Sequence, residues 1–160
     1  MGTEIKIHPK LDLIFERTTT MSPEKIWKAW TDPETLMKWF CSRPWKVSEA
    51  RIDLKPGGEF YTLMQSPEGQ TFPSMGCYLE VIPQKKLTWT NVMTAGFRPA
   101  VLNQEDFAIT ATLILEQRGK ETLYKAWVTH ANEEGRKKHE AMHFEEGWGA
   151  AFNQLQELMK

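Results

Sequence analysis

The sequence has few cysteines, little net charge and no long apolar run, and each shortage argues against a class of protein. Only Cys41 and Cys77 occur among 160 residues, in no CxxC arrangement, so two reduced thiols are expected rather than a disulfide. A formal net charge of -1 offers no basic surface for nucleic acid or an anionic membrane. No stretch approaches the roughly 18 apolar residues of a membrane span, and no secretory signal is recognisable. We therefore expect a cytoplasmic protein without nucleic-acid or membrane partners.

Signatures of catalysis are also missing. The sequence contains no GxSxG elbow, P-loop or GxGxxG turn, and neither cysteine has a histidine close by in sequence. Acid–base chemistry stays open, because Glu59, Glu80 and Asp106 fall on predicted strands whose faces the sequence does not assign. The expectation is a protein with no catalytic residues and no cofactor, with buried acids as the alternative.

One motif resembles a metal site. His139-Glu140-Ala141-Met142-His143 matches HExxH, which on a helix places two imidazoles one turn apart beside a carboxylate. A catalytic zinc needs a third protein ligand, and the positions where one family of zinc proteases has Gly and His are Glu146 and Gly149 here. His130 would matter only if it faced this helix. We predict no metal site, with His139 and His143 on a partly exposed helix face.

Turn and cap residues divide the chain clearly. An opening strand is expected from Leu11 to about Thr20, and Ser22-Pro23-Glu24 and Asp32-Pro33-Glu34 begin two short helices, the second extending to Phe40. Period-two patterns then predict six further strands with mostly short turns, which favours antiparallel pairing. They run from Val47 to Leu54, Glu59 to Met64, Met75 to Ile82, Lys86 to Val92, Asp106 to Glu116 and Thr122 to His130. We expect one domain, residues 1–160, with a flexible segment at 1–9.

The last 29 residues, Asn132 to Lys160, predict one long helix with an apolar stripe. The stripe consists of Phe144, Trp148, Ala151, Leu155 and Leu158, widened by Met142, Phe152 and Met159. Gly147 and Gly149 flank Trp148, although glycine costs a helix about 1 kcal/mol relative to alanine. They either leave space for a ligand or permit close packing on the sheet.

One connection is long. Residues 93–105 join two predicted strands and contain Gly96 and Pro99, a length at which loops are often functional. We expect this segment to be a lid over a cavity, with Phe97 and Arg98 the residues closest to a ligand.

The chain resembles the family named after the activator of the 90-kDa heat-shock chaperone ATPase, in particular its single-domain bacterial members. The resemblance rests on Phe15-Glu16-Arg17, residues 23–34 (PEKIWKAWTDPE), Trp39, Pro56-Gly57-Gly58-Glu59-Phe60, residues 76–81 (GCYLEV), residues 87–90 (LTWT) and Glu146-Gly147-Trp148-Gly149. It implies an α+β helix-grip fold of the START and birch-pollen-allergen-like superfamily. In that fold a curved antiparallel sheet of six or seven strands surrounds a long C-terminal helix, and two short helices follow the first strand. Superfamily members include lipid carriers, hormone receptors, aromatic cyclases and co-chaperones.

Aromatic and sulfur-containing residues supply the candidate site. The sequence has seven Trp, eight Phe and eight Met, and a sheet curled around a helix tends to leave an apolar cavity. The predicted ligand-binding residues are Trp39, Trp45, Tyr61, Met75, Trp89, Phe97, Arg98, Trp127, Met142, Trp148 and Phe152. An ordinary packed core would use the same residues.

Three functions therefore remain. The first is non-enzymatic binding of an apolar or aromatic small molecule. The second is a co-chaperone or protein-interaction module, which would show an exposed apolar patch beside a filled cavity. The third is a cyclase or hydrolase that uses cavity acids. The sequence is compatible with a monomer or a homodimer.

Overall fold

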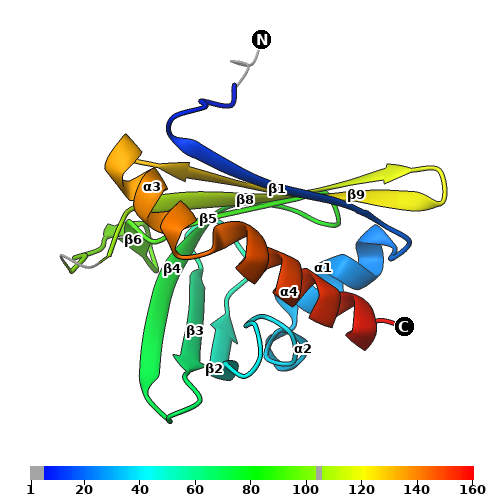
Figure 1. The fold of residues 1–160 in the computed structure, drawn as a ribbon, viewed down its shortest axis with the longest axis horizontal. Coiled ribbons are helices and arrows are strands. Elements are labelled where there is room, and N and C mark those ends of the chain that lie inside the picture. Colours follow the sequence, from blue (N-terminus) through cyan, green and yellow to red (C-terminus); the bar gives the residue numbers. More distant parts are fainter. Residues whose placement is uncertain (1–5, 104–105) are drawn as a thin grey trace.

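A seven-stranded antiparallel sheet forms the framework, as expected. The structure is a computed structural model that describes residues 6–103 and 106–160, and its strand order is β1-β9-β8-β5-β4-β3-β2. The strands are β1 (Asp12–Thr19), β2 (Lys46–Ile52), β3 (Glu59–Gln65), β4 (Thr71–Ile82), β5 (Lys86–Thr90), β8 (Ile109–Arg118) and β9 (Glu121–His130). The helices are α1 (Pro23–Thr31), α2 (Pro33–Leu36), α3 (Glu133–Ala141) and α4 (Phe144–Leu158) (Figure 1). This arrangement confirms the predicted helix-grip fold.

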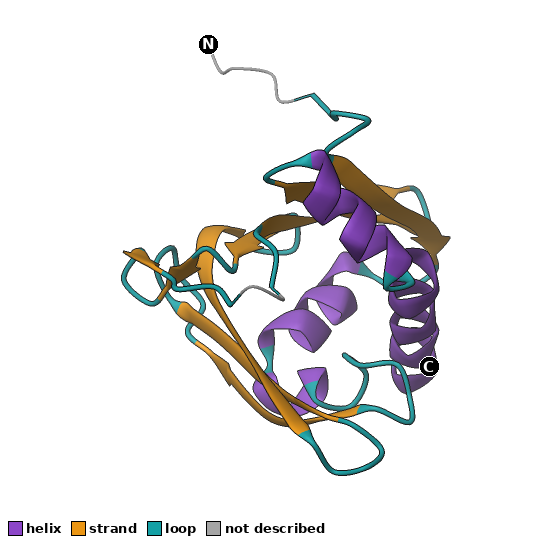
Figure 2. Ribbon diagram, turned by 60° about the vertical axis from the view of Figure 1, so that its left-hand side comes forward, coloured by secondary structure: helices purple, strands orange, loops and turns teal. Residues whose placement is uncertain are grey.

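The two edges of the sheet come from consecutive strands. The chain leaves β1 at one edge, crosses through α1 and α2 to β2 at the other, and returns strand by strand to β9. The sheet bends around the helices (Figure 2), and the buried apolar residues form a core cluster between these layers. A ligand site enclosed by both layers is therefore built from segments far apart in sequence.

Both predicted starts of the short helices are confirmed. The Ser22 hydroxyl accepts a hydrogen bond from the Lys25 amide, and the Asp32 carboxylate accepts one from the Thr35 amide. The prediction that the second helix reaches Phe40 was wrong, because α2 ends at Leu36. Residues 37–40 continue as turns that direct Trp39 inward, where its indole Nε1 donates to the Ala29 carbonyl at 3.1 Å.

The prediction of a single terminal helix was also wrong. It is divided into α3 and α4 at His143, whose φ of 63° lies in the left-handed region. Residues 133–141 bury no side chain, so no apolar stripe holds the two halves on one axis. The stripe of α4 is largely buried as predicted, but Met142 before it is 63% exposed and Leu158 at its end is 37% exposed.

Two strands begin three or four residues from the predicted position, each for a local reason, and the other strand ends lie within two residues of the prediction. Strand β4 begins at Thr71 rather than Met75. Its first half pairs with β3 alone, so this half has a free edge, and Pro73, which has no amide hydrogen, is tolerated there. Strand β8 begins at Ile109 rather than Asp106. The side chain of Asn91 occupies the place of ladder partners there, since it donates to the Phe107 carbonyl and accepts from the Ile109 amide.

The predicted lid packs against a turn. Within residues 93–103, β6 (Met93–Thr94) pairs with β7 (Arg98–Pro99), and the Gly96 amide donates to the Gly57 carbonyl at 2.7 Å. A Cβ atom at Gly57 would lie 2.7 Å from the Phe97 ring, so glycine is required at this contact. Residues 104–105 of the lid and 1–5 of the predicted flexible segment lie outside the described residues. The flexibility of 6–9 stays a prediction.

Candidate functional site

An apolar cavity of about 320 Å³ lies between α4, the α1–α2 region and β3. It is lined by Trp30, Trp39, Phe40, Cys41, Ser42, Trp45, Met64, Tyr124, Gly147, Trp148 and Ala151. None of these side chains carries a charge at neutral pH. We call this space the first cavity.

Four tryptophans give the first cavity flat walls. The rings of Trp30 and Trp148 stack with centroids 6.0 Å apart, and Trp39 meets Trp30 edge-on at 5.1 Å. The Trp30 Nε1 donates to the Tyr124 hydroxyl at 3.1 Å, and Trp39 donates to the Ala29 carbonyl. Because both indole N–H groups are satisfied within the protein, these two residues offer a ligand their apolar faces rather than donors.

Gly147, rather than Gly149, leaves space beside Trp148. A Cβ atom at Gly147 would have no neighbour within 4 Å, and this residue lines the first cavity. A Cβ atom at Gly149 would touch Phe15 and Arg17 of β1 at 3.8–3.9 Å. The two glycines therefore serve the two roles considered for them: Gly147 borders the cavity, and Gly149 lies against the sheet.

A second cavity of about 180 Å³ lies beside the first. Phe40, Met64 and Trp148 line both cavities. The remaining residues of the second cavity are Phe60, Thr62, Ser74, Met75, Gly76, Trp89, Asn91, Ile109, Ala111, Val128 and His139. It is therefore less uniformly apolar than the first.

The cavities contain five of the eleven predicted site residues. Trp39 and Trp45 line the first cavity, Met75 and Trp89 border the second, and Trp148 lines both. Met75 borders the second cavity, but its side chain points away from it. Met75 is paired directly with Tyr61, cross-strand partners share a face, and the Tyr61 ring lies on the outer face of the sheet. Sequence reasoning missed Trp30, Phe40, Met64 and Tyr124. Their apolar periodicity predicted burial but gave no signal for a cavity.

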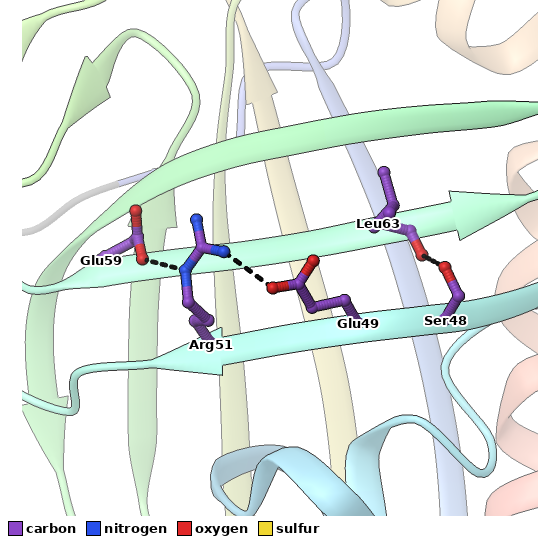
Figure 3. A network of polar contacts seen from close by, with 5 residues as sticks. All are labelled: Ser48, Glu49, Arg51, Glu59 and Leu63. Carbon is purple, nitrogen blue, oxygen red and sulfur yellow. Dashed lines mark hydrogen bonds and ion pairs between the residues drawn. The ribbon is translucent and has the colours of Figure 1, made fainter.

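Tyr61 and Trp127 lie on the outer face of the sheet, away from both cavities. The guanidinium of Arg51 covers the Tyr61 ring at 3.9 Å. Figure 3 shows the same Arg51 between Glu49 and Glu59, each bound at 2.9 Å. The indole Nε1 of Trp127 donates to the Asp12 carboxylate at 2.9 Å.

The other four predicted residues do not line either cavity. Phe152 is a core residue that packs on Tyr124 and Phe15, with ring centroids 4.8 and 6.0 Å away. Met142 is exposed between α3 and α4. Phe97 and Arg98 are exposed on the β6–β7 hairpin, and Phe97 rests against Gly57.

The ionisable groups near the site are neutral. Burial raises the pKa of the Cys41 thiol to about 11, so it stays protonated and is a poor nucleophile. No carboxylate of the described residues lines either cavity. Glu80 is paired with Lys86 at 2.6 Å, and Glu59 with Arg51 on the outer face. Among the described residues, neither cavity therefore has a carboxylate of the kind that a cyclase or hydrolase would need.

The HExxH residues do not form one helical face. His143 is exposed at the junction of α3 and α4, 4.0 Å from Glu146, whereas His139 is half-buried. His130 does face α3: its Nε2 lies 2.9 Å from Nδ1 of His139. The described residues contain no group of three or more His, Cys, Asp or Glu side chains that could hold a metal ion.

The sequence matches the family model described as Activator of Hsp90 ATPase homolog 1-like protein over residues 20–160. The chain belongs to this family. Membership suggests a fold that binds hydrophobic ligands or another protein. None of the described helices is both long enough and apolar enough to span a bilayer.

Solved structures of similar proteins share the fold. A protein from Nitrosomonas europaea is 44% identical, with 95% of this chain and 96% of that chain covered and a TM-score of 0.90. Proteins from Rhodobacter sphaeroides (24% identity, TM-score 0.79, 97% of each chain) and Mycobacterium smegmatis (21%, 0.80, 99% and 96%) share the fold. A search of curated proteins finds no match.

Proposed function

We propose that the protein binds an uncharged apolar or aromatic small molecule in the first cavity, without catalysing a reaction. The observation that carries this proposal is an unfilled space of about 320 Å³ with four tryptophans and no charged side chain in its walls. Small-molecule sites typically measure about 300–1,000 Å³ and are mostly apolar. Trp30, Trp39, Trp45 and Trp148 are the proposed contact residues, and the cytoplasm is the proposed location.

An unfilled cavity favours ligand binding over the two alternatives. A protein-interaction module would be expected to fill its core, because empty space forfeits packing energy. A cyclase or hydrolase would need a carboxylate at the reacting atoms, and the described lining residues include none.

Titration with N-phenyl-1-naphthylamine, a neutral probe that fluoresces in apolar surroundings, tests the proposal. The parent protein is expected to bind one probe molecule per chain. Gly147→Leu should abolish binding while the protein stays folded, since the new side chain enters open space and leucine favours a helix by about 1 kcal/mol.

Gly149→Ala is the matched control, because it removes the other mid-helix glycine without entering the cavity. It should bind the probe as the parent does. Failure of the parent to bind, or equal binding by Gly147→Leu, would contradict the proposal. Native mass spectrometry of freshly purified protein would reveal a retained ligand directly.

A further inference from the structure

The second cavity contains a buried hydroxyl without a partner. Thr62 is 3% exposed and lies between Phe60 and Met64 on the inward face of β3. Its hydroxyl makes no hydrogen bond to any described residue. Among the described residues, the only fully enclosed side-chain polar atom without a partner is Tyr78 Oη, so the Thr62 oxygen borders open space. A buried hydroxyl in this state is costly unless something completes its hydrogen bonding.

His139 is the second polar group of this cavity. The hydrogen bonds of the His130–His139 pair determine which ring nitrogen of His139 carries a proton. The Leu11 carbonyl can only accept, so Nδ1 of His130, 2.7 Å away, carries a proton. The Nε2 atom of neutral His130 then has no proton and accepts from Nδ1 of His139 at 2.9 Å. The Nε2 atom of His139 is left as a bare acceptor, with no partner in the described part of the chain. His139 lines the second cavity.

We propose that the second cavity is a polar subsite that receives a hydroxyl or N–H group of the ligand whose apolar body occupies the first cavity. His139 Nε2 accepts from this group, and the Thr62 hydroxyl, which can donate or accept, completes its hydrogen bonds. Ser74, the direct cross-strand partner of Thr62, adds a hydroxyl at the more exposed side. The inference rests on the proposed function and specifies its ligand class: a neutral, elongated molecule with one polar end.

The residues that the two cavities share are compatible with such a ligand. They are Phe40, Met64 and Trp148, and the unbranched Met64 side chain can adopt other rotamers at little cost. A charged end group is disfavoured, since none of the described side chains lining the second cavity carries a formal charge and burying an unpaired ion is costly. Burial also lowers the pKa of His139 to about 4, which keeps its ring neutral.

The test compares two probes of nearly equal shape, 4-phenylphenol and 4-methylbiphenyl, by displacement of N-phenyl-1-naphthylamine. The parent should prefer the phenol by about three- to tenfold, the usual effect of one hydrogen bond. Thr62→Val, which replaces the hydroxyl with a methyl group, and His139→Gln should reduce this preference while 4-methylbiphenyl binds as before. Ser42→Ala, whose hydroxyl lines the first cavity only, should keep it.

The outcomes separate the two proposals. Equal affinity of the parent for both probes, or an unchanged preference in both Thr62→Val and His139→Gln, would overturn the polar subsite and leave the first cavity intact as a binding site. If neither probe displaces N-phenyl-1-naphthylamine, or if that probe itself fails to bind, the proposed function fails as well. Thr62→Ala serves as the second variant if Thr62→Val does not fold.

Discussion

The side-chain amide nitrogen of Gln154 lies 2.6 Å from the carbonyl oxygen of Cys41, which ties α4 to the wall of the first cavity. The same amide donates to the Trp39 carbonyl at 3.0 Å, and its oxygen accepts from the Arg43 amide at 2.9 Å. Residues 39–43 have no regular secondary structure, so one buried side chain supplies the hydrogen bonds that this segment lacks. Gln154 thus positions Trp39, Phe40 and Cys41 without lining the cavity.

Gln154→Leu is expected to lower the free energy of unfolding by about 2–4 kcal/mol, since three backbone groups lose their partner. It should also weaken binding of N-phenyl-1-naphthylamine, because the cavity wall loses its attachment to α4. Urea denaturation and a fluorescence titration measure the two effects. Asn153→Leu is the control: the neighbouring side chain is exposed, and its loss should change stability by no more than about 0.5 kcal/mol. Equal effects of both changes would contradict the assigned role.

The sequence predicted the beginnings of elements better than it predicted contacts across the fold. Ser22 and Asp32 act locally, since each caps the amide three residues later, and their pattern is visible in the chain. Gln154 and its partners are more than 110 residues apart, and the pairing of His130 with His139 depends on how α3 crosses β9. No local pattern encodes such contacts.

The faces of the strands explain why Tyr61 and Trp127 do not line a cavity. Along β3, Phe60, Tyr61, Thr62 and Leu63 alternate between faces, but both faces carry large or apolar side chains. The aromatic ring of Tyr61 predicts a place in the cavity, whereas the structure has that ring under Arg51 on the outer face. The next residue, Thr62, lies on the inner face and lines the second cavity, and its small polar side chain did not indicate a ligand-binding site in the sequence.

The His130–His139 pair predicts a stability that falls in mild acid. Burial is the main cause that lowers the pKa of His130 below its usual 6.5 and that of His139 to about 4. Asp12 opposes the shift at His130 and Arg136 adds to it, while His130 adds to the shift at His139. Below about pH 6.5 the unfolded chain therefore binds protons that the folded protein does not, so stability is present above this pH and lost toward pH 4.

Thermal denaturation between pH 7.5 and 4.5 measures this effect. The melting temperature of the parent should fall as the pH is lowered, and His139→Gln should make this fall smaller. His143→Gln should keep the parent's pH dependence and its stability, because this histidine of the HExxH motif is exposed at the helix junction. A parallel decline in the parent and in His139→Gln would show that other groups cause the acid sensitivity.

Trp148→Phe is expected to separate ligand contact from stability. Trp148 stacks on Trp30 and lines both cavities, so a smaller ring widens the space and reduces the flat surface that a ligand can contact. The free energy of unfolding should fall by about 1–2 kcal/mol, and affinity for N-phenyl-1-naphthylamine should fall several-fold. Trp127→Phe is the matched control, since its indole lies on the outer face and its hydrogen bond to the Asp12 carboxylate is lost, at a cost of about 1.5–3 kcal/mol. Its affinity should equal that of the parent. If Trp148→Phe binds the probe as tightly as the parent, or if Trp127→Phe weakens binding equally, the ligand does not occupy the space beside Trp148.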